Sequence, residues 1–214
     1  MSIKIGIILG STRKSSNTKG ISKYFESILK TNEEFKNIKI EIIHLTESFG
    51  HPLPFELENE IPQSKSNLKE NLPNEYSNLL IKNWSKTISN WNGLIIITPQ
   101  YNWGYPALLK NSFDHLYYEW NNLPFGLITI GGHGGSKVFK QLSEILEGGL
   151  KMKLINKDNN LQINLPKKYI ISSEEDRVKG DENWLKDYKQ DFEELIQDLL
   201  QTIKERRNEE NVEL

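Results

Sequence analysis

One stretch of this chain constrains its fold more than any other. Residues 93–97 (Gly-Leu-Ile-Ile-Ile) form an apolar run that passes directly into the loop sequence Thr-Pro-Gln-Tyr-Asn-Trp-Gly-Tyr-Pro at residues 98–106, and a helical pattern follows. Such a run is typical of a parallel strand buried on both faces. Ligands of open parallel sheets bind at the carboxyl ends of the strands. The stretch therefore predicts an α/β fold with a ligand site near residues 98–106.

The rest of the chain repeats this alternation of strand and helix. We expect strands at residues 3–9, 38–45, 93–98 and 127–130, an interrupted strand at 152–165, and helices around residues 21–29, 74–91, 106–120, 137–149 and 184–203. Crossover helices must cover both faces of a parallel sheet. The pattern predicts a flavodoxin-like three-layer α/β sandwich with a five-stranded parallel sheet in the order 2-1-3-4-5.

The same pattern predicts the domain organisation. Residues 1–204 are expected to form one domain, and residues 205–214 a charged and frayed C-terminal tail. Residues 47–73 contain several prolines and form a long connection between predicted elements. A connection of this length inside a compact domain is usually functional or mobile.

Composition excludes several classes of protein. The chain has 214 residues, a formal net charge of -2 and no cysteine. Disulfides, thiol catalysis and cysteine-ligated metal centres are thereby excluded, and we expect no metal site. The near-neutral charge gives no general attraction to nucleic acid or to membranes. Because the apolar runs are short and the N-terminus leads directly into a strand, we expect a cytoplasmic protein.

The loop at residues 10–18 follows the first predicted strand and precedes a helix. Free backbone N–H groups and the positive end of the helix dipole favour an anion at such a place. Hydroxyl and amide side chains add donors, and the Arg13 guanidinium can bind a phosphate through two N–H groups. The loop has neither a G-x-x-x-x-G-K-[ST] nor a G-x-G-x-x-G motif. We expect a phosphate site here; the alternative is a plain cluster of helix-capping residues.

Two further loops follow the third and fourth predicted strands. Residues 99–105 combine aromatic and amide side chains, which suit a flat ring with polar edges such as a flavin, although the aromatics would also suit a cover over ordinary core. Residues 131–136 contain four glycines, which allow close backbone approach to a flat ligand or a merely flexible loop. His133 alone is weak evidence for catalysis, because it stands among glycines without a second histidine nearby.

The predicted strand order brings the three loops together. Strands one, three and four are neighbours in the order 2-1-3-4-5, and their carboxyl ends meet at the topological switch point. One loop would then hold a phosphate while the other two bracket a ring.

These loops resemble those of a known family. Residues 9–17 (Leu-Gly-Ser-Thr-Arg-Lys-Ser-Ser-Asn) are similar to the G-S-x-R-x-x-S phosphate loop of NAD(P)H-dependent FMN reductases. Residues 99–102, with Pro106 and residues 109–114, resemble that family's P-E-Y-N…P…L-K-N-x-x-D segment. With residues 131–136, the set is most similar to the fungal NAD(P)H:quinone/FMN reductases. Like them, this chain has a glutamine, Gln100, where the wider family has glutamate.

The resemblance implies non-covalent FMN as cofactor and NADPH or NADH as electron donor. The FMN phosphate would be held by Ser11, Arg13, Ser16, Asn17 and Thr18. The ring and the ribityl chain would be lined by Pro99, Gln100, Tyr101, Asn102, Trp103 and Gly104. The ring edge would be approached by Gly132, His133, Gly134, Gly135 and Ser136, with His133 as the one candidate for a catalytic side chain.

The expected activity is that of an NAD(P)H-dependent FMN or quinone oxidoreductase. Hydride would pass by a ping-pong mechanism from NAD(P)H through FMN to quinones, free flavin, azo compounds or ferric chelates. The resemblance also implies a homodimer or tetramer. Two other classes stay open: a flavodoxin-like electron carrier, and a flavin redox-sensing module that binds a regulatory protein partner. The physiological acceptor and the choice between NADH and NADPH are not fixed by these motifs.

Overall fold

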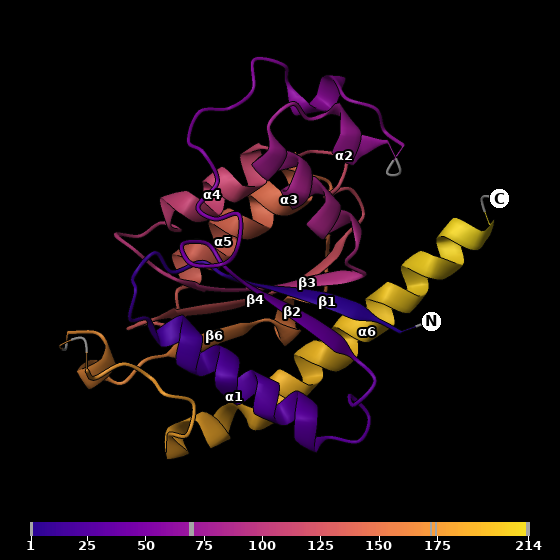
Figure 1. Ribbon diagram of the computed structural model, residues 1–214. Coiled ribbons are helices and arrows are strands. Elements are labelled where there is room, and N and C mark those ends of the chain that lie inside the picture. Colours follow the sequence, from indigo (N-terminus) through magenta and orange to yellow (C-terminus); the bar gives the residue numbers. More distant parts are fainter. Residues whose placement is uncertain (1, 69–70, 172, 174, 213–214) are drawn as a thin grey trace.

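A parallel sheet runs through the middle of the molecule, between two layers of helices (Figure 1). The computed structural model describes residues 2–68, 71–171, 173 and 175–212. Its strands are β1 (Lys4–Leu9), β2 (Lys39–His44), β3 (Gly93–Pro99), β4 (Pro124–Gly131), β5 (Lys153–Leu154) and β6 (Leu161–Asn164). They lie in the order β2-β1-β3-β4-β5, with β6 also paired to β4. This confirms the predicted flavodoxin-like order 2-1-3-4-5.

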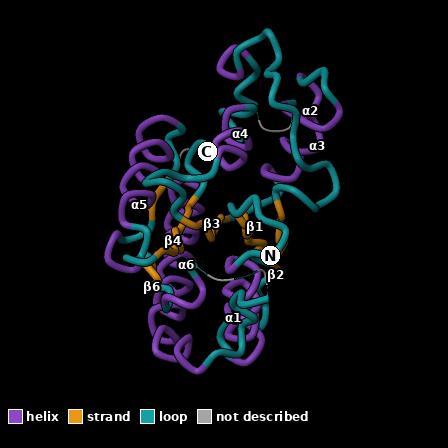
Figure 2. The backbone as a smooth tube through the Cα atoms, turned by 90° about the vertical axis from the view of Figure 1, so that its left-hand side faces the viewer, coloured by secondary structure: helices purple, strands orange, loops and turns teal. Residues whose placement is uncertain are grey.

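The helices divide the core into two halves. In the side view of Figure 2, α1 (Asn17–Thr31) and α6 (Lys189–Val212) lie on one side of the strands, while α3 (Leu79–Ser89) and α4 (Ala107–Asp114) lie on the other. The first half packs around Phe25 and Phe192, and the second around Trp84 and Trp120. Strands β1 and β3 are buried from both sides because their isoleucines alternate between the two halves.

The predicted interruption of the fifth strand is present and has a clear cause. Segment β5 pairs with the start of β4, and β6 pairs with its end. A 3₁₀ turn at Lys157–Asn159 separates the two segments. The side chain of Asn160 replaces the missing ladder bond, because its Oδ1 accepts from the backbone N–H of Leu127 at 2.7 Å. The sheet therefore keeps its hydrogen bonding across the break.

Several element boundaries differ from the predictions. The helix expected over residues 74–91 is divided into α2 (Leu72–Glu75) and α3, because Asn78 caps α3 by accepting from the N–H of Leu80 at 2.9 Å. The helix expected over residues 106–120 ends at Asp114. The helix expected over residues 137–149 is α5 (Ser136–Ser143) followed by a π-type turn at Glu144–Gly149.

The C-terminal helix also differs from its prediction. A 3₁₀ turn at Asn183–Tyr188 precedes α6, which continues to Val212 rather than ending near Ile203. The charged segment from residue 205 is thus helical as far as Val212, and residues 213–214 lie outside the described residues. Within the described ranges, no helix is both long enough and apolar enough to cross a membrane.

The long connection at residues 47–73 is held in its middle by α4. The Asn111 side chain donates to the carbonyl oxygens of Leu53 and Pro54 at 3.3 and 3.1 Å, and His115 Nε2 lies 2.8 Å from the Pro54 carbonyl. The outer part of the connection carries exposed apolar side chains, among them Phe49 and Phe55. This connection projects beyond α3 and α4, on the side of the sheet away from α1 (Figure 1).

Candidate functional site

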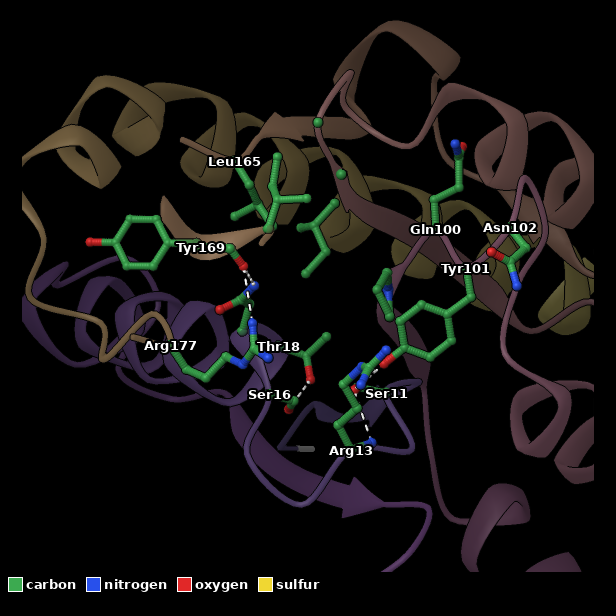
Figure 3. Close-up of a pocket in the computed structure, with 16 residues that line it drawn as sticks. Ser11, Arg13, Ser16, Thr18, Gln100, Tyr101, Asn102, Leu165, Tyr169 and Arg177 are labelled. Carbon is green, nitrogen blue, oxygen red and sulfur yellow. Dashed lines mark hydrogen bonds between the residues drawn. The ribbon is translucent and has the colours of Figure 1, made fainter. Parts of the chain in front are cut away.

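A cleft of about 540 Å³ opens at the carboxyl ends of β1, β3 and β4 (Figure 3). Its volume lies in the range of about 300–1,000 Å³ that is usual for small-molecule sites. Its walls are formed by Ser11, Arg13, Ser16, Asn17, Thr18, Pro99, Gln100, Tyr101, Asn102, Ile130, Gly131, Gly132, Leu165, Tyr169, Ile170 and Arg177. The three loops that the sequence predicted to meet therefore do meet, and a fourth segment joins them.

The first loop presents an anion-binding surface. Ser16 is the N-cap residue of α1, yet its side chain accepts no capping hydrogen bond from a backbone N–H of the first turn. Its hydroxyl instead lies 2.9 Å from the Thr18 hydroxyl. The first turn of α1 also contains no acidic residue. The Lys19 N–H donates to the Ser16 carbonyl at 3.3 Å, which leaves the N–H groups of Asn17 and Thr18 and the helix dipole to meet an anion from the cleft.

Arg13 is positioned by the second loop. Its guanidinium lies 5.3 Å from the centre of the Tyr101 ring, a cation–π arrangement. The Tyr101 hydroxyl lies 2.9 Å from Ser11 Oγ, which also accepts from the backbone N–H of Arg13 at 3.3 Å. These contacts join the first and second loops across the cleft and hold the cation at its edge (Figure 3).

The second loop is a tight turn with an exposed tip. Tyr101 and Gly104 exchange backbone hydrogen bonds of 2.8 and 2.9 Å. Asn102 and Trp103 have positive φ angles of 48° and 68°, which non-glycine residues seldom adopt. The Trp103 side chain is 70% exposed, and Lys137 Nζ lies 5.0 Å from its ring centre. Trp103 and Gly104, which were expected to line the ring, lie outside the cleft wall.

The third loop contributes less to the cleft than its glycines suggested. Gly134 and Gly135 are buried with φ angles of 67° and 75°, and a Cβ on them would lie about 3 Å from Gln162 and Thr129 respectively. These glycines therefore fold the loop onto β4 and β6. Gly132 lines the cleft, whereas His133 and Ser136, both exposed, do not.

A fourth segment of the wall was missed by sequence reasoning. We call it the C-terminal strap and define it as residues 165–171 and 175–178. It contributes Leu165, Tyr169, Ile170 and Arg177 to the cleft. The strap follows β6 and returns across the start of α1, where Asn17 Oδ1 accepts from the N–H of Val178 at 3.0 Å. No local pattern marks this contact, because its two residues are 161 positions apart.

The cleft is positively charged although the whole chain is not. Arg13 and Arg177 both line it, and within the described part of the chain no carboxylate lies within 4.0 Å of either guanidinium as an ion-pair partner. Among the described residues, no group of three or more histidine, aspartate or glutamate side chains is placed to hold a metal ion. The donor set suits a phosphate-bearing ligand.

Fold and site together define the class. The sheet is flavodoxin-like, an anion-binding loop follows β1, and the loops after β3 and β4 bound the cleft. This is the arrangement of α/β proteins that bind a phosphorylated flavin or nucleotide at the topological switch point. Residues 3–162 match the family model of the NADPH-dependent FMN reductases. The chain belongs to this family and is therefore an oxidoreductase that uses FMN and NAD(P)H.

Individual relatives agree with this assignment. The NAD(P)H-dependent FMN reductase LOT6 of Saccharomyces cerevisiae is 37% identical over 155 residues, which cover 72% of this chain and 78% of the yeast protein. The NAD(P)H-dependent FMN reductase C4B3.06c of Schizosaccharomyces pombe is 33% identical over 151 residues, 71% of this chain and 68% of that protein. The NAD(P)H:(acceptor) oxidoreductase FerB of Paracoccus denitrificans shares the fold, with a TM-score of 0.61 at 16% identity over 94% of this chain and 98% of FerB.

The residues present fit FMN. The first turn of α1, without acidic residues, and the guanidinium groups of Arg13 and Arg177 suit its phosphate. The apolar and backbone surfaces of Pro99, Ile130 and Gly131 suit a flat ring, and the Gln100 and Asn102 amides suit its polar edge.

Proposed function

We propose that this chain reduces small flat oxidants by a ping-pong mechanism, in which NAD(P)H and the oxidant occupy the same side of the cleft in turn. The observation that carries the proposal is a cleft with a cationic end at α1 and an exposed rim at Asn102 and Trp103. Quinones, free flavin, azo compounds and ferric chelates are the acceptors that such an open rim would admit.

The cationic end of the cleft binds and orients FMN. Bound FMN supplies the electron-transfer chemistry between NAD(P)H and the acceptor. Arg13 and the first turn of α1 hold its phosphate, and the hydroxyls of Ser11, Ser16 and Thr18 complete the donor set. The hydrogen bond between Ser11 and Tyr101 joins this end of the cleft to the second loop, which would form the wall beside the flavin ring.

The rim receives the second molecule. Trp103 is held by Lys137 over its ring and by Gln141, whose side chain donates to the Trp103 carbonyl at 3.2 Å. A large exposed aromatic ring fixed in this way offers a stacking surface for a nicotinamide or a quinone. His133 is exposed and outside the cleft wall, so the proposal gives it no proton to transfer.

We also propose that the chain acts as a homodimer. Large apolar side chains are exposed along the long connection and at the start of α3, namely Phe49, Phe55, Leu57, Ile61, Leu68 and Leu79. A surface of this kind is typical of a protein–protein interface. The expected cytoplasmic location stays a prediction.

Initial-rate kinetics test the ping-pong mechanism. NADPH is varied at several fixed concentrations of a water-soluble quinone, and the double-reciprocal plots are compared. The proposal predicts parallel lines, because NADP⁺ leaves before the quinone enters. Intersecting lines would show that both substrates bind together, and the shared-rim proposal would then be wrong. Replacing the quinone by free FMN, an azo dye or a ferric chelate then ranks the acceptors.

A further inference from the structure

The C-terminal strap lies beyond residues 3–162, the part of the chain that matches the family model, and it places a second arginine in the cleft. Arg177 reaches the cleft from the strap, whereas Arg13 reaches it from the first loop. In Figure 3 the two side chains flank Ser16 and Thr18, one on each side. The first turn of α1 therefore lies between two guanidinium groups that come from distant parts of the chain.

The strap is fixed to α1 by contacts that need no ligand. The Asn17 side chain binds it at two points: Nδ2 donates to the Tyr169 carbonyl at 2.9 Å, and Oδ1 accepts from the Val178 N–H at 3.0 Å. Gly20 allows the close approach, because a Cβ at this position would lie 2.0 Å from the Val178 carbonyl oxygen. Arg177 is thus held beside the helix N-terminus by its neighbours on the strap.

The hydrogen bonding of Arg177 is incomplete. Its Nη1 donates to the Tyr169 carbonyl at 3.2 Å. Its Nε is buried and has no hydrogen-bond partner among the residues that the structure describes. A buried, charged donor without an acceptor is costly. Arg177 lines the cleft, so its guanidinium group faces an acidic ligand group bound there.

We propose that Arg177 binds the FMN phosphate together with Arg13, so that the phosphate lies between two guanidinium groups at the N-terminus of α1. The inference rests on the proposed place of the phosphate in the first loop. It assigns a cofactor-binding role to the strap, which carries none of the motifs of the first three loops. The competing role for Arg177 is purely structural: its bond to Tyr169 would only shape the strap.

Flavin titrations of the Arg177→Met variant separate the two roles. The apoprotein is titrated with FMN and with riboflavin, which lacks the phosphate, and flavin fluorescence gives each Kd. Loss of a charge-assisted hydrogen bond predicts a rise of about 10- to 100-fold in the Kd for FMN. The Kd for riboflavin should not change. Arg177→Lys keeps the charge without the planar fork and should fall between the wild type and Arg177→Met.

The control variant is Lys179→Met, which removes an exposed positive charge two positions from Arg177 and outside the cleft. It should bind both flavins as the wild type does. The melting temperature of each apoprotein gives an independent readout. The substitution removes the Nη1 bond to the Tyr169 carbonyl together with the unpartnered Nε, so this temperature checks that each variant folds.

Other outcomes would overturn the assignment in distinguishable ways. An Arg177→Met variant that loses affinity equally for FMN and riboflavin would make Arg177 a structural residue of the strap. An unchanged Kd for FMN would remove Arg177 from the site while leaving FMN binding intact. A wild-type protein that binds neither flavin would contradict the cofactor site itself.

Discussion

At the scale of single residues, the site depends on side chains that leave a backbone or charged group unsatisfied in the free protein. Ser16 stands at the N-cap of α1 without accepting a hydrogen bond from a backbone N–H of its first turn, and Arg177 buries an Nε without an acceptor. Buried polar groups usually find partners inside a protein, so the incomplete bonding of Arg177 beside the start of α1 favours an acidic ligand in this cleft. Arg13 was predictable because its loop follows a buried strand and precedes a helix. Arg177 was not, since no local pattern ties it to the loop at residues 10–18.

His51, which does not line the cleft, should make the stability of the fold sensitive to acid. Burial lowers the pKa of His51 to about 4 from its usual 6.5. Its ring lies edge-on to Trp84 with centres 5.0 Å apart, and its Nδ1 is buried without a partner among the described residues. The unfolded chain takes up this proton near pH 6.5, before the folded protein does. Stability is therefore lost as the pH falls from 6.5 towards 4.

The His51→Phe variant tests this account by urea denaturation at two pH values. Between about pH 7.5 and pH 5.5, the free energy of unfolding should fall about 1 kcal/mol more in the wild type than in the variant, after allowance for partial exposure. Burial also lowers the pKa of His115 and of His44, but those contributions are common to both proteins. The same pH dependence in both would contradict the assignment to His51.

At the scale of elements, α1 and the strap are in such close contact at Gly20 that adding one methyl group there should destabilise the fold. In an unconstrained helix, replacing Gly20 by alanine would stabilise the folded state by about 0.5–1 kcal/mol. Here its Cβ would meet the Val178 backbone at 2.0 Å, which no side-chain rotation can relieve. We expect Gly20→Ala to lower the free energy of unfolding by about 2 kcal/mol and to weaken FMN binding, as measured by urea denaturation and fluorescence titration.

The matched control is Gly148→Ala, where a Cβ meets nothing within 4 Å. That variant should be as stable as the wild type or more stable by up to about 1 kcal/mol. If Gly20→Ala instead behaved like Gly148→Ala, the strap would have to be free to move away from α1, and its role in shaping the cleft would be lost.

Elements that depend on local burial were predictable from the sequence, whereas those that depend on distant contacts were not. Strands β1 and β3 were predicted almost to the residue, because burial on both faces leaves uninterrupted apolar runs. The division between α2 and α3 was not predicted, because it depends on the carboxylate of a residue distant in the sequence. Glu58 Oε1 accepts hydrogen bonds from the backbone N–H groups of Ser77 and Asn78, each at 2.8 Å. The glycines of the third loop indicated unusual backbone geometry, but not that two of them pack against the sheet.

At the scale of the whole molecule, the long connection at residues 47–73 gives the protein an apolar face. Phe49 is 96% exposed and Phe55 is 70% exposed, which favours an interface between two copies of the chain. Sedimentation velocity should therefore show a dimer, and the double variant Phe49→Asp/Phe55→Asp should be monomeric at the same concentration. The control Ile171→Asp, at a 72% exposed position on the strap, should remain dimeric. A monomeric wild type, or a double variant that stays dimeric, would contradict this.

The central claim is that the cleft at the carboxyl ends of β1, β3 and β4 holds FMN that NAD(P)H reduces. The most direct test is the visible absorbance spectrum of the purified protein, loaded with FMN and followed under anaerobic conditions as NADPH is added. We predict flavin absorbance bands that are retained through gel filtration and bleach rapidly on addition of NADPH. A colourless protein that fails to retain FMN, or a bound flavin that NADPH leaves oxidised, would contradict the account.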